Sequence, residues 1–309
     1  AITGCDDVTS VTIPSEIEGK PVTTIAERAF SSKSKLLKVT LPDSVTTIES
    51  RAFNDCSHLR SVDMGNGVKT IGTFAFSGCN ELTSITLSEN LTEIGESAFN
   101  QCSALTELAL PDSVATIGNG VFASCSKLKQ VTLPNGLTSI SESMFSECSA
   151  LTSVALPDSV TSIEYCAFKN CLKLQQIPLP EGLTTIGDSA FYGCSGLEQI
   201  TFPEDLTSMG ASAFYNCSGL AQVTLPNSLT STGKEVFSSC SSLTFAEIPE
   251  GFTELADGTF SNCGSLKDVK LPNSLQKIGG GAFQNCDALT EITILDNFRI
   301  IHIESNLLF

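Results

Sequence analysis

Cysteine gives this 309-residue chain its widest range of possible chemistry, and the sequence contains thirteen cysteines. Thiols can pair as disulfides, bind zinc or act as nucleophiles. Eleven of the thirteen follow one another at intervals of 23 residues. These are Cys56, Cys79, Cys102, Cys125, Cys148, Cys171, Cys194, Cys217, Cys240, Cys263 and Cys286. No Cys-x-x-Cys pair occurs, so the spacing does not favour zinc.

The regular interval favours a packing role for this cysteine column, because free cysteine behaves as a small buried hydrophobe. Stacked coils would bring neighbouring Cα atoms to about 5 Å, which lies within the disulfide range. Parallel side chains do not aim their sulfurs at one another, however, so we expect reduced thiols. Cys5 and Cys166 lie off the interval, and Cys5, near the free terminus, is the better candidate for a reactive thiol.

Histidine and the acidic residues do not form a catalytic or metal-binding pattern. His58 and His302 are 244 residues apart, and the serines and cysteines recur as part of a repeat. No glycine-rich phosphate loop and no EF-hand pattern is present. Acidic residues after proline, such as Asp43, share their repeat position with Asn66 and its equivalents, which favours turn capping over a calcium ladder. We expect no enzyme activity, no cofactor and no metal.

Phenylalanine shows what positions these residues, because it recurs at the same interval of 23. The series is Phe30, Phe53, Phe76, Phe99, Phe122, Phe145, Phe168, Phe191, Phe214, Phe237, Phe260 and Phe283. A fixed period of this length predicts stacked repeats, in which neighbouring units bury a continuous core. We expect the rings to form a stacked ladder inside about twelve coils.

Each repeat predicts the same order of local structure. Leu-x-x-Val-x-Leu is typical of a short strand with one buried face, and the Pro-Asp-Ser or Pro-Asn-Gly step that follows is typical of a turn. Val-Thr-x-Ile predicts a second short strand, and a glycine such as Gly72 or Gly118 then suits a corner with positive φ. Ala-Phe-x-x-Cys predicts a single helical turn. The expected fold is an elongated, curved, single-domain solenoid.

The unit resembles the 23-residue, treponemal-type leucine-rich repeat of BspA-like bacterial surface proteins. One copy contains Leu105, Leu108, Leu110, Pro111 and Val114 at the matching positions. The resemblance implies residues 1–24 as a first, cap-like repeat with an insertion and residues 25–301 as the leucine-rich repeat solenoid. Residues 302–309 are then the C-terminal end or the result of a truncation. It also implies a secreted or cell-surface protein with a concave strand side, linked to adhesion and to binding of host proteins.

The net charge of −17 argues against a nucleic-acid partner. No apolar run is long enough for a membrane span, and no signal segment opens the chain, so we expect a mature or trimmed form. Residues 70–126 and 174–233 contain no Lys or Arg. The acidic surface either keeps copies of the chain apart or docks a basic partner, and we favour the first alternative.

The outward positions of the first strand form the candidate partner-binding face, because they are free to vary without harming the core. The candidates are Lys38, Thr40, Ser61, Asp63, Ser84, Thr86, Glu107, Gln130, Thr132, Ser153, Gln176, Gln199, Thr201, Gln222, Thr224, Phe245, Glu247, Asp268 and Lys270. Protein hot spots favour Trp, Tyr and Arg, and this set contains none of them. We therefore expect weak or multivalent contacts.

Two aromatic features depart from the repeat. Phe245 takes an outward position beside Ala246, so either it is an exposed ligand contact or the strand bulges and turns it inward; we favour the bulge. Tyr192 and Tyr215 take identical positions in adjacent repeats. They could hold a sugar or a peptide, or pack on each other, and we favour mutual packing.

The function expected from the resemblance and from the missing catalytic groups is non-enzymatic binding at a bacterial surface. The expected partner is a host or matrix protein, or a glycan. The alternative is a passive spacer or surface-coat module of a larger anchored protein. An enzyme is the least favoured reading, and turnover that depends on His58 or His302 would revive it.

Overall fold

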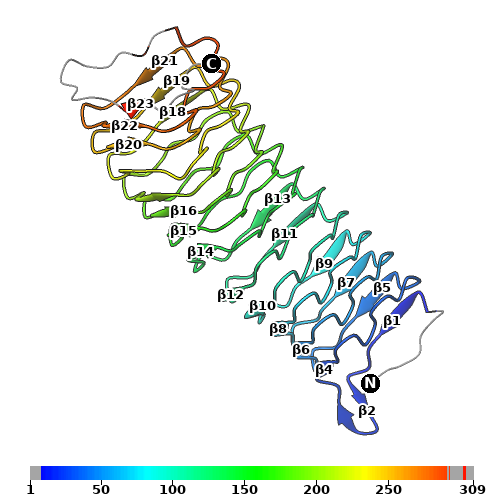
Figure 1. The fold of residues 1–309 in the computed structure, drawn as a ribbon. Helices are drawn as coiled ribbons and strands as arrows, with labels where there is room; N and C mark the ends of the chain where they lie inside the picture. The colour runs from blue at the N-terminus through cyan, green and yellow to red at the C-terminus, as the bar shows by residue number, and fades with distance from the viewer. Residues whose placement is uncertain (1–7, 291, 293–301, 304–309) are drawn as a thin grey trace. The chain divides into compact units, whose positions relative to one another are not determined.

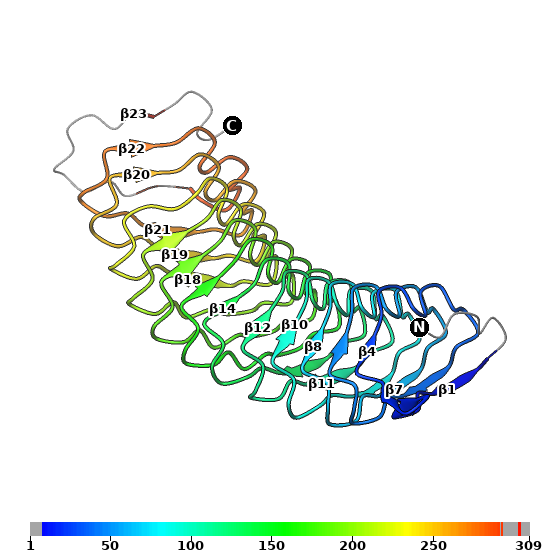
Figure 2. The same cartoon turned by 90° about the horizontal axis from the view of Figure 1, so that it is seen from below.

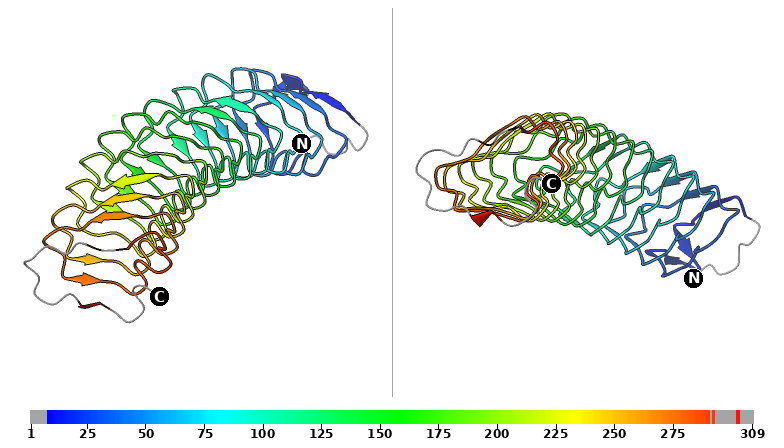
Figure 3. Two further views of the ribbon diagram at one scale, coloured as in Figure 1. Left: turned by 90° about the horizontal axis from the view of Figure 1, so that it is seen from above. Right: turned by 45° about the horizontal axis from the view of Figure 1, so that its top comes forward.

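The computed structural model describes residues 8–290, 292 and 302–303, which form a β-solenoid with coils of about 23 residues (Figure 1). Cys5 and residues 304–309 lie outside the described residues. Among the residues that are described, no helix occurs, and none therefore has the length and apolarity needed to cross a bilayer. The chain divides into two compact units, Ala1–Leu137 with Ser143–Pro157, and Thr138–Glu142 with Asp158–Phe309. In the views of Figure 3 the coils of each unit lie one upon the next.

In the first unit, the first strands of successive coils pair in parallel but form two separate sheets. One contains β1 (Ser10–Thr12), β5 (Lys38–Thr40), β7 (Ser61–Asp63) and β9 (Ser84–Thr86). The other contains β11 (Glu107–Ala109) and β13 (Gln130–Thr132). The ladder is therefore interrupted between β9 and β11.

The second strands of the coils that begin with β1, β5, β7, β9 and β11 form one unbroken five-stranded sheet (Figure 2). They are β4 (Thr24–Ile25), β6 (Thr47–Ile48), β8 (Thr70–Ile71), β10 (Glu93–Ile94) and β12 (Thr116–Ile117). In the insertion of the first repeat, β2 (Glu16–Ile17) and β3 (Lys20–Pro21) form an antiparallel hairpin.

The second unit contains three sheets of parallel strands. The second strands β14 (Ser139–Ile140), β15 (Ser162–Ile163), β16 (Thr185–Ile186) and β17 (Ser208–Met209) form one of them. The first strands β18 (Gln222–Thr224), β19 (Phe245–Glu247) and β21 (Asp268–Lys270) form another. The last joins β20 (Glu254–Leu255), β22 (Lys277–Ile278) and β23 (His302–Ile303).

The first strands expected at 153–155, 176–178 and 199–201 do not form. Pro178 has no backbone N–H and cannot donate a ladder hydrogen bond. At this repeat position the N–H points toward the preceding coil, so Pro178 explains why 176–178 and 153–155 do not pair. Nothing in the structure explains the loss at 199–201.

The predicted phenylalanine ladder is confirmed within each unit. In the first unit, ring centroids from Phe30 to Phe145 follow one another at 5.1 to 6.0 Å with nearly parallel planes. In the second, the rings from Phe168 to Phe283 stack at 5.0 to 5.8 Å. All twelve side chains are buried, so the ladder is the centre of the core.

The single helical turn predicted for Ala-Phe-x-x-Cys is wrong. In the second coil, Arg51, Phe53 and Asp55 donate backbone N–H groups to carbonyls of the next coil at 2.7 to 2.9 Å. The residues between them close short turns, as in the bond from Cys56 N–H to the Phe53 carbonyl at 3.2 Å. Arg51 and Asp55 have φ of 56° and 58°. A helix needs every N–H for its own preceding turn, so this segment instead forms a ladder between coils.

The corner glycines serve a purpose other than the expected positive φ. Gly118 does not have a positive φ, but a Cβ placed on it would lie 2.4 Å from the Glu96 nitrogen of the preceding coil. The Gly118 N–H also donates to the Ile94 carbonyl at 2.8 Å. Glycine is therefore required at this corner because two backbones approach closely there.

Candidate binding face

We call the outward first and third residues of the first strands, with their equivalents in coils where that strand is absent, the strand face. In β5, β7, β11 and β13 the middle residue is buried, and the side chains on either side of it point outward. Of the predicted residues, Thr40, Ser61, Phe245 and Glu247 are half-buried and the others are exposed.

Parallel pairing aligns these side chains in rows from coil to coil. Lys38, Ser61 and Ser84 form one row of the first unit, and Thr40, Asp63 and Thr86 form the other. In the second unit, Gln222, Phe245 and Asp268 form a row, with Thr224, Glu247 and Lys270 beside it. Each row is a set of polar groups held about 4.8 Å apart by the backbone ladder.

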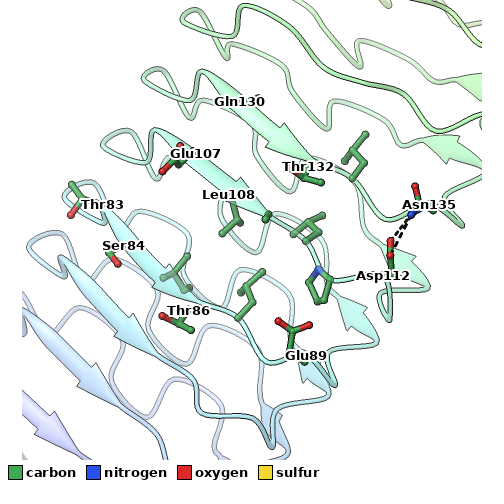
Figure 4. Close-up of a pocket in the computed structure, with 16 residues that line it drawn as sticks. Thr83, Ser84, Thr86, Glu89, Glu107, Leu108, Asp112, Gln130, Thr132 and Asn135 are labelled. Carbon is green, nitrogen blue, oxygen red and sulfur yellow. Dashed lines mark hydrogen bonds between the residues drawn. The ribbon is translucent and has the colours of Figure 1, made fainter.

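A groove opens in the strand face of the first unit where β9 and β11 fail to pair (Figure 4). Its volume is about 830 Å³. Ile85 and Leu87, which correspond to buried residues in the neighbouring coils, are half-buried on its floor. The sequence analysis missed this groove. Ser88 stands where Pro42 and Pro111 follow the strand in other coils, but Gly65 also departs from proline there and β7 still pairs with β9, so this position does not predict the groove.

The groove is lined by carboxylates and hydroxyls without a basic side chain. Glu89, Glu107 and Asp112 contribute the negative charges, and Figure 4 shows them around the opening. Asp112 accepts hydrogen bonds from the Asn135 backbone N–H at 3.0 Å and from its side-chain amide at 3.3 Å. Because these groups line a concave surface, their field favours a cationic ligand.

Two further grooves lie in the second unit. One, of about 560 Å³, runs from Gln176 to Glu204 and includes Pro178 and Pro203. The other, of about 720 Å³, includes Glu247 and Lys270.

The favoured bulge at Phe245 is wrong. β19 pairs with both neighbours in regular register, Ala246 is fully buried, and Phe245 lies half-buried on the strand face. The Lys270 ammonium lies 5.3 Å from the centre of its ring and 3.5 Å from a Glu247 carboxylate oxygen. The ring is therefore partly covered by lysine.

The tyrosine pair packs on itself, which was the favoured alternative. Tyr192 and Tyr215 stack with ring centroids 4.8 Å apart and planes 6° apart, and both are half-buried. The Lys169 ammonium lies 5.6 Å from the centre of the Tyr192 ring.

The cysteine column holds reduced thiols that bond between coils. Cys102 donates its S–H to the Phe76 carbonyl at 3.3 Å, and Cys125 donates to that of Phe99 at 3.2 Å. Burial raises the pKa of Cys125 to about 12. Cys166, off the column, is also buried and free. Thiols in this state pack the core and are poor nucleophiles.

The acidic turn residues cap the next coil, as expected. Asp43 accepts the Asn66 backbone N–H at 2.7 Å, and Glu250 accepts that of Asn273 at 3.0 Å. The hydrogen bond from Asn273 lowers the pKa of Glu250. His58 lies on the surface beside Ser57 and Glu81, in a cluster with no recognisable catalytic arrangement.

Comparisons with known proteins agree with this architecture. The family model of the BspA type leucine rich repeat region matches residues 1–129, 115–243 and 184–306. A search of curated protein sequences finds no match. A leucine-rich repeat protein from Bacteroides ovatus is 30% identical, with a TM-score of 0.66 over 92% of this chain and 86% of its own.

Two other solved structures are similar. A leucine rich cell surface protein from Faecalibacterium prausnitzii is 30% identical, with a TM-score of 0.55 over 94% of this chain and 91% of its own. The pneumococcal vaccine antigen PcpA shares the fold at 22% identity, with a TM-score of 0.57 over 94% of this chain and 90% of its own. Repeat spacing, core and family match agree, and this chain belongs to the BspA-type leucine-rich repeat family.

Proposed function

We propose that this chain is a non-enzymatic binding module displayed on a bacterial surface, where its strand face contacts a host or matrix protein or a glycan. The observation that carries the proposal is the strand face itself. Its polar side chains stand in aligned rows on a rigid ladder, and the core residues between them are buried. Such positions accept new side chains at little cost to folding, as a recognition surface requires.

Two further observations support this function. The Faecalibacterium prausnitzii protein, 30% identical over most of both chains, is described as a cell surface protein. The strand face carries few aromatic or arginine anchors, so affinity is expected to come from several weak contacts along the rows.

A binding panel tests the proposal. The full chain is screened on a glycan array and against purified extracellular matrix proteins, beside a variant carrying Thr132→Arg and Thr224→Arg on the strand face. The matched control carries Thr116→Arg and Ser208→Arg, which are exposed first residues of β12 and β17. We expect the strand-face variant to lose roughly tenfold or more in affinity, equal to about 1.4 kcal/mol, and the control to bind like the parent.

Two results would count against it. If the parent chain binds neither the glycan array nor the matrix proteins, a binding role is contradicted and a passive spacer is favoured. Equal losses in both variants would mean that the strand face is not the contact surface.

A further inference from the structure

The groove between β9 and β11 exposes backbone groups that other coils use for pairing. Leu41 N–H donates to the Asp63 carbonyl at 2.8 Å, and Met64 N–H donates to that of Thr86 at 3.2 Å. Over the residues that the structure describes, no such bond runs from Leu87 to Ala109 or from Thr106 to Thr83. The five-stranded sheet of the same coils stays paired, with β10 against β12 in register. The opening is therefore confined to the strand face.

The direction of the exposed groups follows from the strand pattern. Ser84 N–H and the Thr86 carbonyl bond toward β7, so the groups of Ile85 between them point to the opposite side, into the groove. On β11, the Thr106 carbonyl accepts from Lys129 at 2.8 Å, so Glu107 and Ala109 point away from β13 and also into the groove. Two strand edges thus face each other across the opening.

An open edge of this kind is a template for another strand. The side chains set the chemistry of that strand: Ile85 and Leu87 offer an apolar floor, while Glu89, Glu107 and Asp112 offer negative charge. The groove at Gln176 carries two carboxylates, Glu181 and Glu204, where the groove between β9 and β11 carries three.

We propose that the groove between β9 and β11 binds an extended peptide segment of a partner protein that carries Lys or Arg, adding it as a strand to the open edges. The inference rests on the proposed binding function and names the partner chemistry of one site on the strand face. A second copy of this chain is not the occupant, because two chains of net charge −17 repel each other. A basic strand pairs with the backbone groups and offsets the negative charge of the three carboxylates.

The test uses a fluorescent seven-residue peptide of alternating lysine and threonine, titrated against the full chain by anisotropy. Two control peptides carry glutamate for lysine, or N-methyl groups on every second amide. We expect the lysine peptide to bind, the glutamate peptide to show no binding, and the methylated peptide to lose roughly tenfold or more because its edge donors are blocked.

Variants locate the site. Ala109→Pro removes an edge N–H at a repeat position where the chain itself carries Pro178, so the coil tolerates proline there. Ala109→Val adds similar bulk and keeps the N–H. Glu107→Gln removes a groove carboxylate, and Glu181→Gln removes one from the groove at Gln176. We expect losses of affinity with Ala109→Pro and Glu107→Gln, and parent-like binding with Ala109→Val and Glu181→Gln.

The outcomes separate this inference from the proposed function. If no lysine peptide binds, or if Glu107→Gln and Glu181→Gln weaken binding equally, the inference is overturned. The strand-face proposal is tested separately by the matrix and glycan panel, which does not involve these peptides. If the glutamate peptide binds as well as the lysine peptide, the charge argument is wrong and the inference fails with it.

Discussion

At the scale of single residues, the chain achieves regularity by repeating side chains that bond between coils. The Cys125 S–H donates to the Phe99 carbonyl in the preceding coil, and the Asp43 carboxylate accepts the Asn66 backbone N–H of the next coil. The cysteine column would suggest redox or metal chemistry if it were counted without its spacing. Burial and the hydrogen bond to a carbonyl instead make each thiol a structural donor. The stability of the fold therefore depends on these thiols staying protonated.

Alkaline pH should destabilise the fold through the buried thiols. The pKa of Cys125 rises from 9.0 to about 12 on burial. A group whose pKa is raised in the folded state contributes stability below pH 9 and loses it as the pH climbs toward 12. The loss is about 1.4 kcal/mol per pH unit for each such thiol. We expect the free energy of unfolding of Cys125→Ala, measured with urea under reducing conditions, to fall less steeply above pH 9 than that of the parent.

Lysines and tyrosines titrate in the same range, but they are common to both proteins and cancel in the comparison. Identical slopes for parent and variant would show that Cys125 ionises as easily in the folded chain as in the unfolded one.

At the scale of elements, each coil has a tight side, where it bonds continuously to its neighbours, and a looser strand side, where that bonding is interrupted. On the tight side, the phenylalanine ladder and the alternating N–H groups join every described coil of the first unit to the next. On the strand side, the ladder stops between β9 and β11. The corner glycines set the close approach of the tight side, since a Cβ there meets the backbone of the preceding coil.

Gly118→Ala should therefore be destabilising by about 1–3 kcal/mol, the usual cost of forcing extra volume into a packed site. Gly136→Ala is the matched control, because its φ is not positive and a Cβ there meets nothing within 4 Å. We expect the control to be neutral, or to stabilise by up to about 1 kcal/mol through the unfolded state. Urea denaturation of both variants measures this, and an equal effect at the two glycines would refute the close-approach explanation.

Phe99→Ala tests the ring ladder. Truncating this fully buried ring should cost about 3–5 kcal/mol. Because contacts in a solenoid run between neighbours, amide exchange should rise first in the coils of Phe76 and Phe122, which stack on Phe99 at 5.6 and 6.0 Å. Tyr165→Ala, at an exposed side chain, should change stability by no more than about 0.5 kcal/mol. A uniform rise in exchange along the chain would contradict nearest-neighbour packing.

At the scale of the whole molecule, the sequence was sufficient for the repeat and the core, because Phe and Cys recur without a slip. The strands were predicted only in part, since three expected first strands do not form. It was insufficient where structure depends on how coils approach each other. The segment after each Ala-Phe was expected to be helical, but its N–H groups found partners in the next coil. Phe245 was expected to turn inward, but regular pairing of β19 outweighed the preference of one ring for burial. The groove at Ile85 arises from a missing ladder, and no residue type encodes that by itself.

The central claim is that this chain is one coil repeated, which offers its strand face to ligands and is open to a further strand between β9 and β11. Amide hydrogen exchange of the full chain, free and with the alternating lysine peptide, tests this most directly. The account predicts that Leu87 and Ala109 exchange faster than Leu41 and Met64 in the free chain, and that the peptide slows Leu87 and Ala109 selectively. Slow exchange at Leu87 and Ala109 in the free chain, equal to that of Leu41 and Met64, would contradict it.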